Sequence, residues 1–510
     1  MAARVVSPSK KLLKSLCNGK FFSTRPLNSS SPSSSISINL TTEKPEQQPP
    51  IDLHQLTNTT SLNLHDVEKL FSSVPTTKLL RASANLQMAA MEPMVDFGMW
   101  VMNSKLMDIE VFKEIVLGFV KHTFYEHFCA GEDALTTGDT VRRLHNGGAG
   151  LRAMLDYAVE YAGDNQSCDR NLEAFLRTVE IAKSLPPSSV SFVIVKISAI
   201  CPLKLLERVS DLLRWQHKNP SFNLAWKMDT LPILSDISPT YHTLKEPEPL
   251  TLEEEHDLQL GHQRLLKICQ NCLESNVPLT IDAEHTSVQP AIDYLTYSSA
   301  IMYNKDDNIL VYGTIQAYLK DAKERLLQAY QAADEMGVPV GIKLVRGAYM
   351  SCERKLASSL GFESPIHNSI RETHTCYNDC ASFMLNKIAN GPGALVLATH
   401  NIESGRIAVG QAHDLGIGKV NQKLEFAQLY GMSDALSFGL RNAGFQVSKY
   451  IPFGPVETVM SYLLRRAEEN RGLLSTSTLD RQLMRNELKR RLNAAIFKAY
   501  KIALNNTMLN

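Results

Sequence analysis

The sequence predicts an α/β fold, a distorted (β/α)8 barrel preceded by a helical arm and followed by an amphipathic helix. Three observations lead to this prediction. After about residue 150, short β-rich runs alternate with helical stretches, and eight such runs occur. They are spread over roughly 320 residues, the length of a barrel with insertions. No GxGxxG turn follows a strand and no GxxxxGK[ST] motif occurs, which disfavours the alternative of a doubly wound open sheet. Strands that alternate with helices imply parallel pairing with right-handed crossovers.

The chain begins with a basic segment. The first 42 residues contain no Asp or Glu but six Lys or Arg residues, and the serine-rich stretch SSSPSSSISI lies among them. This composition is typical of an organelle transit peptide, and the charge favours mitochondria because an energised membrane draws cations inward. We therefore assign 1–45 to a mitochondrial transit peptide. Residues 46–145 carry apolar positions at helical spacing, as in IEVFKEIVLGFVKHTFYEHF, and predict an N-terminal helical arm.

The catalytic barrel is predicted over 146–475. Its strands are expected within 153–160, 191–200, 277–286, 308–318, 338–349, 393–401, 419–429 and 447–453. One intervening helix ends on Gly337, as a helix C-terminus should. The crossover at 201–276 is far longer than the others and includes the acidic stretch EPEPLTLEEEHDLQ. We expect a surface excursion there, with a helix from about residue 251.

Residues 476–510 are predicted to hold a final amphipathic helix over 479–504. Its apolar residues fall near one face, and most of the remainder is basic. The apolar positions are Leu483, Leu488, Leu492, Ile496 and Ala499. Two interpretations remain open: the helix packs on the barrel, or it lies in the plane of an anionic membrane surface.

Composition excludes several classes of function. Lys+Arg and Asp+Glu balance at 53 each, so nothing indicates nucleic-acid binding. No run of 18 apolar residues occurs, which disfavours a spanning helix. Nine cysteines are few for 510 residues and indicate a reducing compartment. Cys269 and Cys272 form a CxxC without a second pair at zinc spacing, so we expect ordinary thiols and no metal.

The predicted strands end in polar side chains, although an ionised group among β-branched residues is costly unless it is paired or used. In a parallel barrel these ends surround the active site. The residues concerned are Lys196, Asp282, Glu284, Gln316, Lys343, Arg346, Tyr349, Thr399, His400, Asn401 and Tyr450. Each alone could be a structural polar group, but six strand ends at one mouth favour a site.

The helix after the last strand contains ETVMSYLLRRAEEN. Tyr462, Arg465, Arg466 and Glu469 stand at i, i+3, i+4 and i+7 and therefore share a face. A solvated charged face is the alternative. Two adjacent guanidinium groups fit a carboxylate, since each can bind it bidentately. Glu469 could hold one of the arginines in place.

Five motifs, LTIDAEHT, GIKLVRGAY, ATHN, FAQLYGM and YIPFGPVETVMSYLLRRAEEN, together resemble those of the proline dehydrogenase family, in its eukaryotic mitochondrial form. The resemblance spans roughly 125–475. It implies a distorted (β/α)8 barrel with FAD at its mouth. It also implies oxidation of L-proline to 1-pyrroline-5-carboxylate by hydride transfer to the flavin, with electrons passed to a membrane quinone, as the first step of proline catabolism. The protein would then reside in the matrix, in peripheral contact with the inner membrane.

Residue roles follow from the same resemblance. Arg465 and Arg466 would bind the proline carboxylate with Lys196 as a third cation, and Leu429 would pack against the ring. The pocket would be shaped, and the arginines oriented, by Asp282, Tyr349, Tyr450 and Tyr462. The flavin site would comprise Gln316, Lys343, Arg346, Gly347, Ala348, Thr399, His400 and Asn401. Lys343 stands where bacterial members often carry Arg near flavin N5. A lysine can donate a hydrogen bond there but lacks the planar guanidinium that binds in a bidentate manner.

Two other classes of function remain open. Barrel lysines such as Lys196 or Lys343 could form a Schiff base, as in an aldolase-like lyase. A matrix scaffold without catalysis is the third possibility. A flavin chromophore in the purified protein would separate the first reading from both.

Overall fold

A computed structural model describes residues 62–146, 150–306, 308–418, 423–472 and 474–508. The predicted transit peptide lies outside these residues. Among the described residues, no helix combines the length and apolar character needed to cross a membrane.

Eight parallel strands form a closed barrel in sequence order, with β1 paired to both β2 and β8. This confirms the predicted fold class, and each predicted run overlaps one strand. The strands are β1 (Arg152–Tyr157), β2 (Val190–Val195), β3 (Leu279–Ile281), β4 (Val311–Gln316), β5 (Gly341–Val345), β6 (Ala394–Ala398), β7 (Leu424–Leu429) and β8 (Gln446–Phe453). The strands are largely buried because helices cover the barrel outside and side chains fill it inside.

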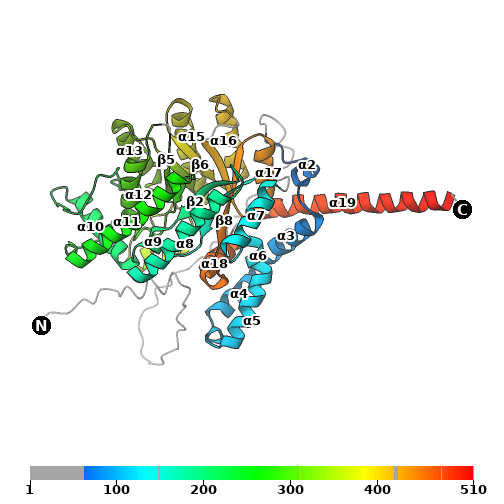
Figure 1. Ribbon diagram of the computed structural model, residues 1–510, viewed down its shortest axis with the longest axis horizontal. Coiled ribbons are helices and arrows are strands. Elements are labelled where there is room, and N and C mark those ends of the chain that lie inside the picture. The colour runs from blue at the N-terminus through cyan, green and yellow to red at the C-terminus, as the bar shows by residue number, and fades with distance from the viewer. Residues whose placement is uncertain (1–61, 147–149, 307, 419–422, 473, 509–510) are drawn as a thin grey trace, which may run out of the picture.

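Helices follow the strands as the alternating pattern predicts (Figure 1). They are α8 (Asn165–Ser184), α9 (Ile197–Ile200), α10 (Leu203–Lys218), α11 (Leu252–Glu274), α12 (Gln289–Tyr303), α13 (Ala322–Glu335), α14 (Met350–Leu360), α15 (Ile370–Asn390), α16 (Ile402–Asp414), α17 (Asp434–Asn442) and α18 (Val456–Gly472). Thr251 is the N-cap of α11, and its side chain forms a capping box with Glu254. The long crossover therefore holds the expected helix, and in addition α10, whose inner face is buried.

The described part of the arm consists mainly of helices. It comprises α2 (Val67–Phe71), α3 (Thr76–Ala89), α4 (Glu92–Asn103), η2 (Lys105–Asp108), α5 (Glu110–Val120), η3 (Lys121–Tyr125), α6 (Glu126–Phe128) and α7 (Ala134–Asn146). In Figure 1, α4 and α5 form a pair that protrudes from the barrel. Lys113 of α5 pairs with Glu457 of α18 at 2.6 Å, which joins this pair to the helix after β8.

The C-terminal helix α19 (Leu474–Met508) is longer than predicted. Its first half packs on the molecule: Leu483 is buried, and Asp480 accepts the backbone N–H of Ala435 at the start of α17 at 2.9 Å. Its second half extends away from the body (Figure 1). Leu492 and Ile496, expected on the same face as Leu483, are exposed.

Candidate active site

Residues in or just after five strands form an ionic network at the barrel mouth. The Nζ of Lys196, just after β2, lies 3.2 Å from Asp156 Oδ1 of β1 and 3.1 Å from Asp282 Oδ2 after β3. The hydroxyl of Tyr450 in β8 donates to Asp282 Oδ2 at 2.8 Å, and Lys343 of β5 pairs with the other oxygen of Asp282. Asp156, Lys196, Asp282 and Lys343 are buried, so each charge is stabilised by its neighbours and not by bulk water.

This network determines the charge of Lys196 and Asp282. Burial alone would lower the pKa of Lys196, but Asp156, Tyr450 and Asp282 outweigh burial and raise it well above its ordinary value. Burial would raise the pKa of Asp282, but Lys343 and Lys196 outweigh it and hold the pKa well below its ordinary value. Lys196 is therefore an ammonium group and Asp282 a carboxylate at neutral pH.

Helix α18 contributes the arginine pair. The guanidinium of Arg465 donates to Glu160 Oε2 at 3.0 Å and lies 5.4 Å from the ring centroid of Tyr349. Arg466 is buried, and its guanidinium lies 4.9 Å from the ring centroid of Tyr462 on the same helix. The side chain of Glu469, expected to hold an arginine, lies outside the described residues. The observed partner of Arg465 is Glu160.

Glu160 and its neighbour Tyr161 are site residues that the sequence interpretation missed. They follow β1, and Tyr161 has a positive φ of 61°. Its hydroxyl lies 3.1 Å from His285 Nε2, and the His285 ring is 4.1 Å from that of Tyr349. A carboxylate at the end of the first predicted strand, like those at the other strand ends, was the signal that could have indicated Glu160.

A second cluster joins the ends of β5 and β6. Arg346 donates to Thr399 Oγ1 at 2.7 Å, to Ser404 Oγ at 2.8 Å and to His374 Nδ1 at 3.0 Å. Asn401 is the N-cap of α16, and its Oδ1 accepts the Ser404 N–H at 2.8 Å. This arrangement presents the N-terminus of α16 next to a guanidinium, a combination that favours phosphate binding.

Other predicted cofactor residues lie beside this cluster. Gly347 has φ +137°, and a Cβ there would collide with the Tyr318 ring, so the turn that also carries Ala348 requires glycine. His400 Nε2 accepts the Leu429 N–H at 3.1 Å. Burial, helped by Lys449 and Arg466, lowers the pKa of His400 to about 3, so the ring is neutral. Gln316 donates to the Glu284 carbonyl at 2.9 Å.

Apolar side chains close one side of the mouth. Leu429, at the end of β7, and Tyr450 pack against a cluster that includes Tyr462 and Leu463 of α18. The site at the barrel mouth thus combines the buried ionic network, apolar side chains on one side and the two arginines of α18. Such a site can hold a small carboxylate with an apolar body. Among the described residues, no group of His, Cys, Asp and Glu could hold a metal ion. Cys269 and Cys272 are buried thiols.

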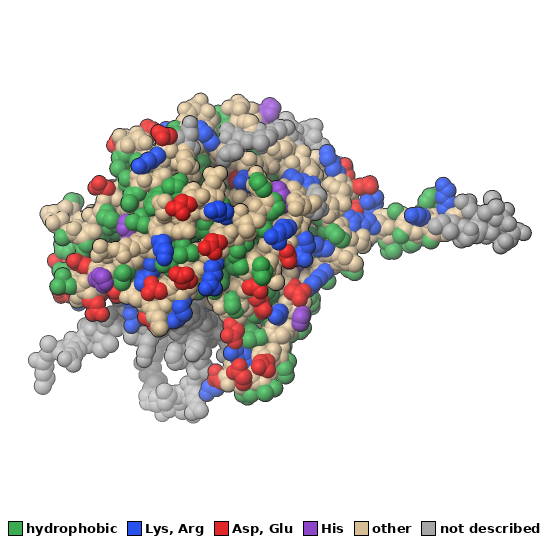
Figure 2. All heavy atoms as spheres, viewed as in Figure 1, with side chains coloured by type: hydrophobic (Ala, Val, Ile, Leu, Met, Phe, Trp, Pro, Cys, Tyr) green, Lys and Arg blue, Asp and Glu red, His purple; other side chains and the backbone are tan. Residues whose placement is uncertain are grey.

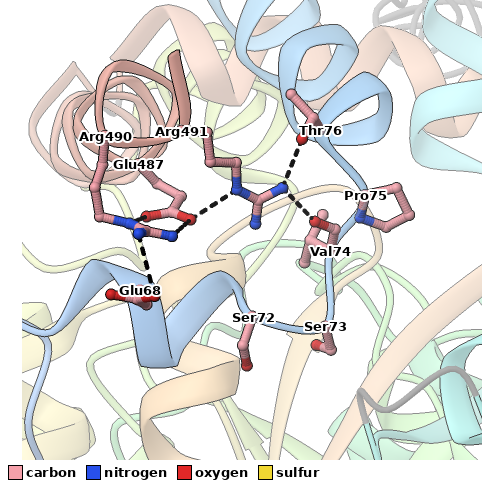
Figure 3. A pocket seen from close by; sticks show the side chains of 9 residues that line it. All are labelled: Glu68, Ser72, Ser73, Val74, Pro75, Thr76, Glu487, Arg490 and Arg491. Carbon is pink, nitrogen blue, oxygen red and sulfur yellow. Dashed lines mark hydrogen bonds and ion pairs between the residues drawn. The ribbon is translucent and has the colours of Figure 1, made fainter. Parts of the chain in front are cut away.

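A surface hollow elsewhere in the molecule lacks these features. It lies between the α2–α3 turn and α19 and is lined by residues that include Glu68, Pro75, Glu487, Arg490 and Arg491 (Figure 3). Arg491 donates there to the carbonyls of Phe71 and Val74, each at 2.8 Å. These bonds join α19 to the end of α2 and the segment between α2 and α3, so the hollow is a structural contact between these helices.

Comparisons with known proteins agree with this geometry. The profile of the family described as proline dehydrogenase matches residues 138–478. The chain is 61% identical over 437 residues to proline dehydrogenase 1, mitochondrial, of Arabidopsis thaliana, which covers 85% of this chain and 87% of the relative. It is 32% identical over 437 residues to human hydroxyproline dehydrogenase, and this match covers 82% of this chain and 91% of that relative. Among solved structures, proline utilization A from Bdellovibrio bacteriovorus, inactivated by N-propargylglycine, has a TM-score of 0.55 at 18% identity. That match covers 82% of this chain and 40% of the longer one, and shows the fold alone.

Proposed function

Because this chain belongs to the proline dehydrogenase family, we propose that it oxidises L-proline to 1-pyrroline-5-carboxylate with FAD as cofactor. The observation that carries the proposal is the buried pair Lys196 and Asp282 at the barrel mouth together with Arg465, which α18 brings to Glu160 at the end of β1. Arg466 is the next residue on the same helix. Proline supplies what this mouth recognises, a carboxylate and a small apolar ring. The higher identity to named proline dehydrogenases supports proline over hydroxyproline.

The substrate is held by groups of opposite character at its two ends. Arg465 and Arg466 bind the carboxylate, and Lys196 adds a third cation nearby. Leu429 and the ring of Tyr450 contact the pyrrolidine ring and exclude water from it. Asp282 holds Lys196, Lys343 and Tyr450 in place through the bonds described above. Orientation of the reacting carbon is the main contribution of these residues to the rate.

The residues of the second cluster fit the cofactor. The chemistry of the donors supports this, since a guanidinium beside a helix N-terminus suits a pyrophosphate. Arg346, Gly347, Ala348, Thr399, His400 and Asn401 would hold FAD, with Gln316 and Lys343 near its flavin ring. When bound, FAD supplies the hydride acceptor for the oxidation.

The proposed setting is the mitochondrial matrix, since two curated relatives that are 61% and 59% identical are named mitochondrial and the first 42 residues are basic without acids. Electrons would pass to a quinone in the inner membrane, with which the protein would make peripheral contact. The alternative of a Schiff-base lyase requires a neutral amine. The raised pKa of Lys196 and the pairing of Lys343 with Asp282 disfavour it.

An absorption spectrum of the purified full chain tests the proposal. We expect flavin bands in the visible region that bleach when L-proline is added without an electron acceptor. A colourless protein that is trapped by borohydride with a carbonyl substrate would instead support the lyase. Flavin bands that proline leaves unchanged would overturn proline as the substrate.

A further inference from the structure

The protruding helix pair α4–α5 exposes a large apolar face. None of the described side chains of α5 is buried, although most are apolar. Val111, Ile115 and Phe119 stand at i, i+4 and i+8, so they form one stripe, and they are 69%, 66% and 56% exposed. On α4, Phe97 and Trp100 are also exposed and their rings stack with centroids 5.9 Å apart. We call these five residues the hairpin face.

The opposite side of this helix pair already has a partner. Met102, Leu117 and Val120 pack against the cluster formed with α18, and Lys113 pairs with Glu457. The hairpin face is therefore what remains after the arm has docked on the barrel. An exposed apolar patch of this kind marks an interaction surface.

Acidic side chains surround the hairpin face. Residues 91–120 contain five Asp or Glu residues and two lysines. Asp108, Glu110 and Glu114 are exposed, and Figure 2 shows acidic side chains beside hydrophobic ones at this end of the molecule. Two hairpin faces brought together would therefore repel, and an anionic surface would repel this face as well.

The second half of α19, which extends away from the body, exposes an apolar stripe and carries basic residues. From Leu492 to Lys501 every side chain is exposed. Leu492, Ile496 and Tyr500 repeat the i, i+4, i+8 stripe, with Phe497 beside it, and are 60%, 58% and 64% exposed. Residues 492–510 contain two lysines, Lys498 and Lys501, and no acid. We call residues 492–501 the tail stripe.

The tail stripe cannot reach the hairpin face of its own chain. α19 is one helix from Leu474 to Met508. Its first half is fixed by the buried Leu483, by Asp480 at the start of α17 and by Arg491 on α2. The second half continues this axis away from the body, while α4 and α5 protrude elsewhere (Figure 1). Folding back would break the helix.

We propose that the tail stripe of each chain docks on the hairpin face of a second copy, so that two chains exchange their C-terminal helices in a closed dimer. The two surfaces match in apolar spacing, which allows helix-on-helix packing, and they are opposite in charge. When each chain places its tail stripe on the hairpin face of the other, a dimer with two-fold symmetry covers all of these exposed surfaces. A membrane would match only the basic tail stripe.

Charge reversal tests this pairing. One variant carries Asp108→Lys and Glu114→Lys on the hairpin, and another carries Lys498→Glu and Lys501→Glu on the tail. Sedimentation velocity of the unaltered chain should give twice the mass of one chain. Each variant alone should dimerise with a dissociation constant weakened on the order of tenfold or more, since like charges then face each other. The two variants mixed should form a dimer again, because each interface then pairs opposite charges.

A matched control is Lys183→Glu with Lys267→Glu, two exposed lysines on α8 and α11, which should leave the dimer intact. Thermal unfolding of each variant checks that it is folded, since all four substituted side chains are exposed. A monomeric unaltered chain at 10-fold the concentration used for activity assays, or a dimer that neither reversal weakens, would overturn the proposal. So would binding of the unaltered chain to anionic vesicles that only the tail variant loses, which would assign the tail stripe to a membrane.

Discussion

At the scale of single residues, the arginines of α18 are the first test of the site. Arg465→Met or Arg466→Met should raise the KM for proline roughly 10- to 150-fold, because a charge-assisted bond to a carboxylate contributes about 1.5–3 kcal/mol. Flavin content should remain near that of the unaltered enzyme. Steady-state kinetics check this, with Arg170→Met on the outer face of α8 as the control. Unchanged proline kinetics in both α18 variants would contradict the carboxylate role.

Tyr450 combines a ring that faces the proposed substrate with a hydroxyl that holds Asp282. Tyr450→Ser should lose proline affinity and narrow the preference for proline over 4-hydroxyproline, because space opens at the ring edge. Tyr450→Phe keeps the ring and should keep most of that preference. The kcat/KM ratio of the two substrates is the measurement. A ratio that stays constant in the Ser variant would mean that Tyr450 does not line the pocket.

Glu284 makes stability depend on pH. Burial, together with the Glu160 charge, outweighs the bonds from Ser198 and raises the pKa of Glu284 to about 7. The folded protein holds this proton up to about pH 7, whereas the unfolded chain loses it near the ordinary value of 4.5. The resulting stabilisation is complete below that ordinary value and is lost as the pH rises through 7.

Relative to Glu284→Gln, the unaltered protein should therefore lose on the order of 3 kcal/mol of unfolding free energy from acidic pH to pH 8. Urea denaturation at several pH values measures this difference. A difference that does not change with pH would show that Glu284 is ionised throughout.

At the scale of secondary structure, α19 behaves as two halves although its sequence pattern is continuous. Leu483→Ala should lower the unfolding free energy by about 2–4 kcal/mol, because the side chain is buried and its removal leaves a cavity. Leu492→Ala, the same change at an exposed position of the same helix, should leave it nearly unchanged. Chemical denaturation of both compares them directly. Equal losses would mean that the second half is also packed within the chain.

At the scale of the whole molecule, α2 near the start of the described chain and the first half of α19 are joined to each other and to the barrel. Arg491 links α19 to α2 through the carbonyls of Phe71 and Val74 and to Thr76 Oγ1 at 3.0 Å. Arg491→Ala removes the charge-assisted bonds to these carbonyls, so it should cost about 1.5–3 kcal/mol and release the arm. Amide exchange across α2 and α3 should then rise. An increase in amide exchange that is confined to α19 would show that other contacts hold the arm in place.

Much of the fold followed from local patterns. Apolar runs of strand length that alternate with helices predicted all eight strands, and Gly337 and Thr251 marked the helix boundaries where they occur. Polar residues at the strand ends could be placed at one mouth because every strand of a parallel barrel ends there. The motifs then predicted the family. These features depend on residues close together in sequence, so the sequence by itself determined them.

The tertiary structure decided which partner each charge meets. Arg465 binds Glu160, 305 residues away in sequence, and Lys196 binds Asp156 across the β1–β2 contact. Neither pairing follows from spacing, because it depends on how the barrel closes and on where α18 crosses its mouth. The same holds for α19, whose apolar stripe is uniform in sequence but buried only up to the point where the body of the protein ends. Burial is a property of the surroundings, and distant segments of the chain supply them.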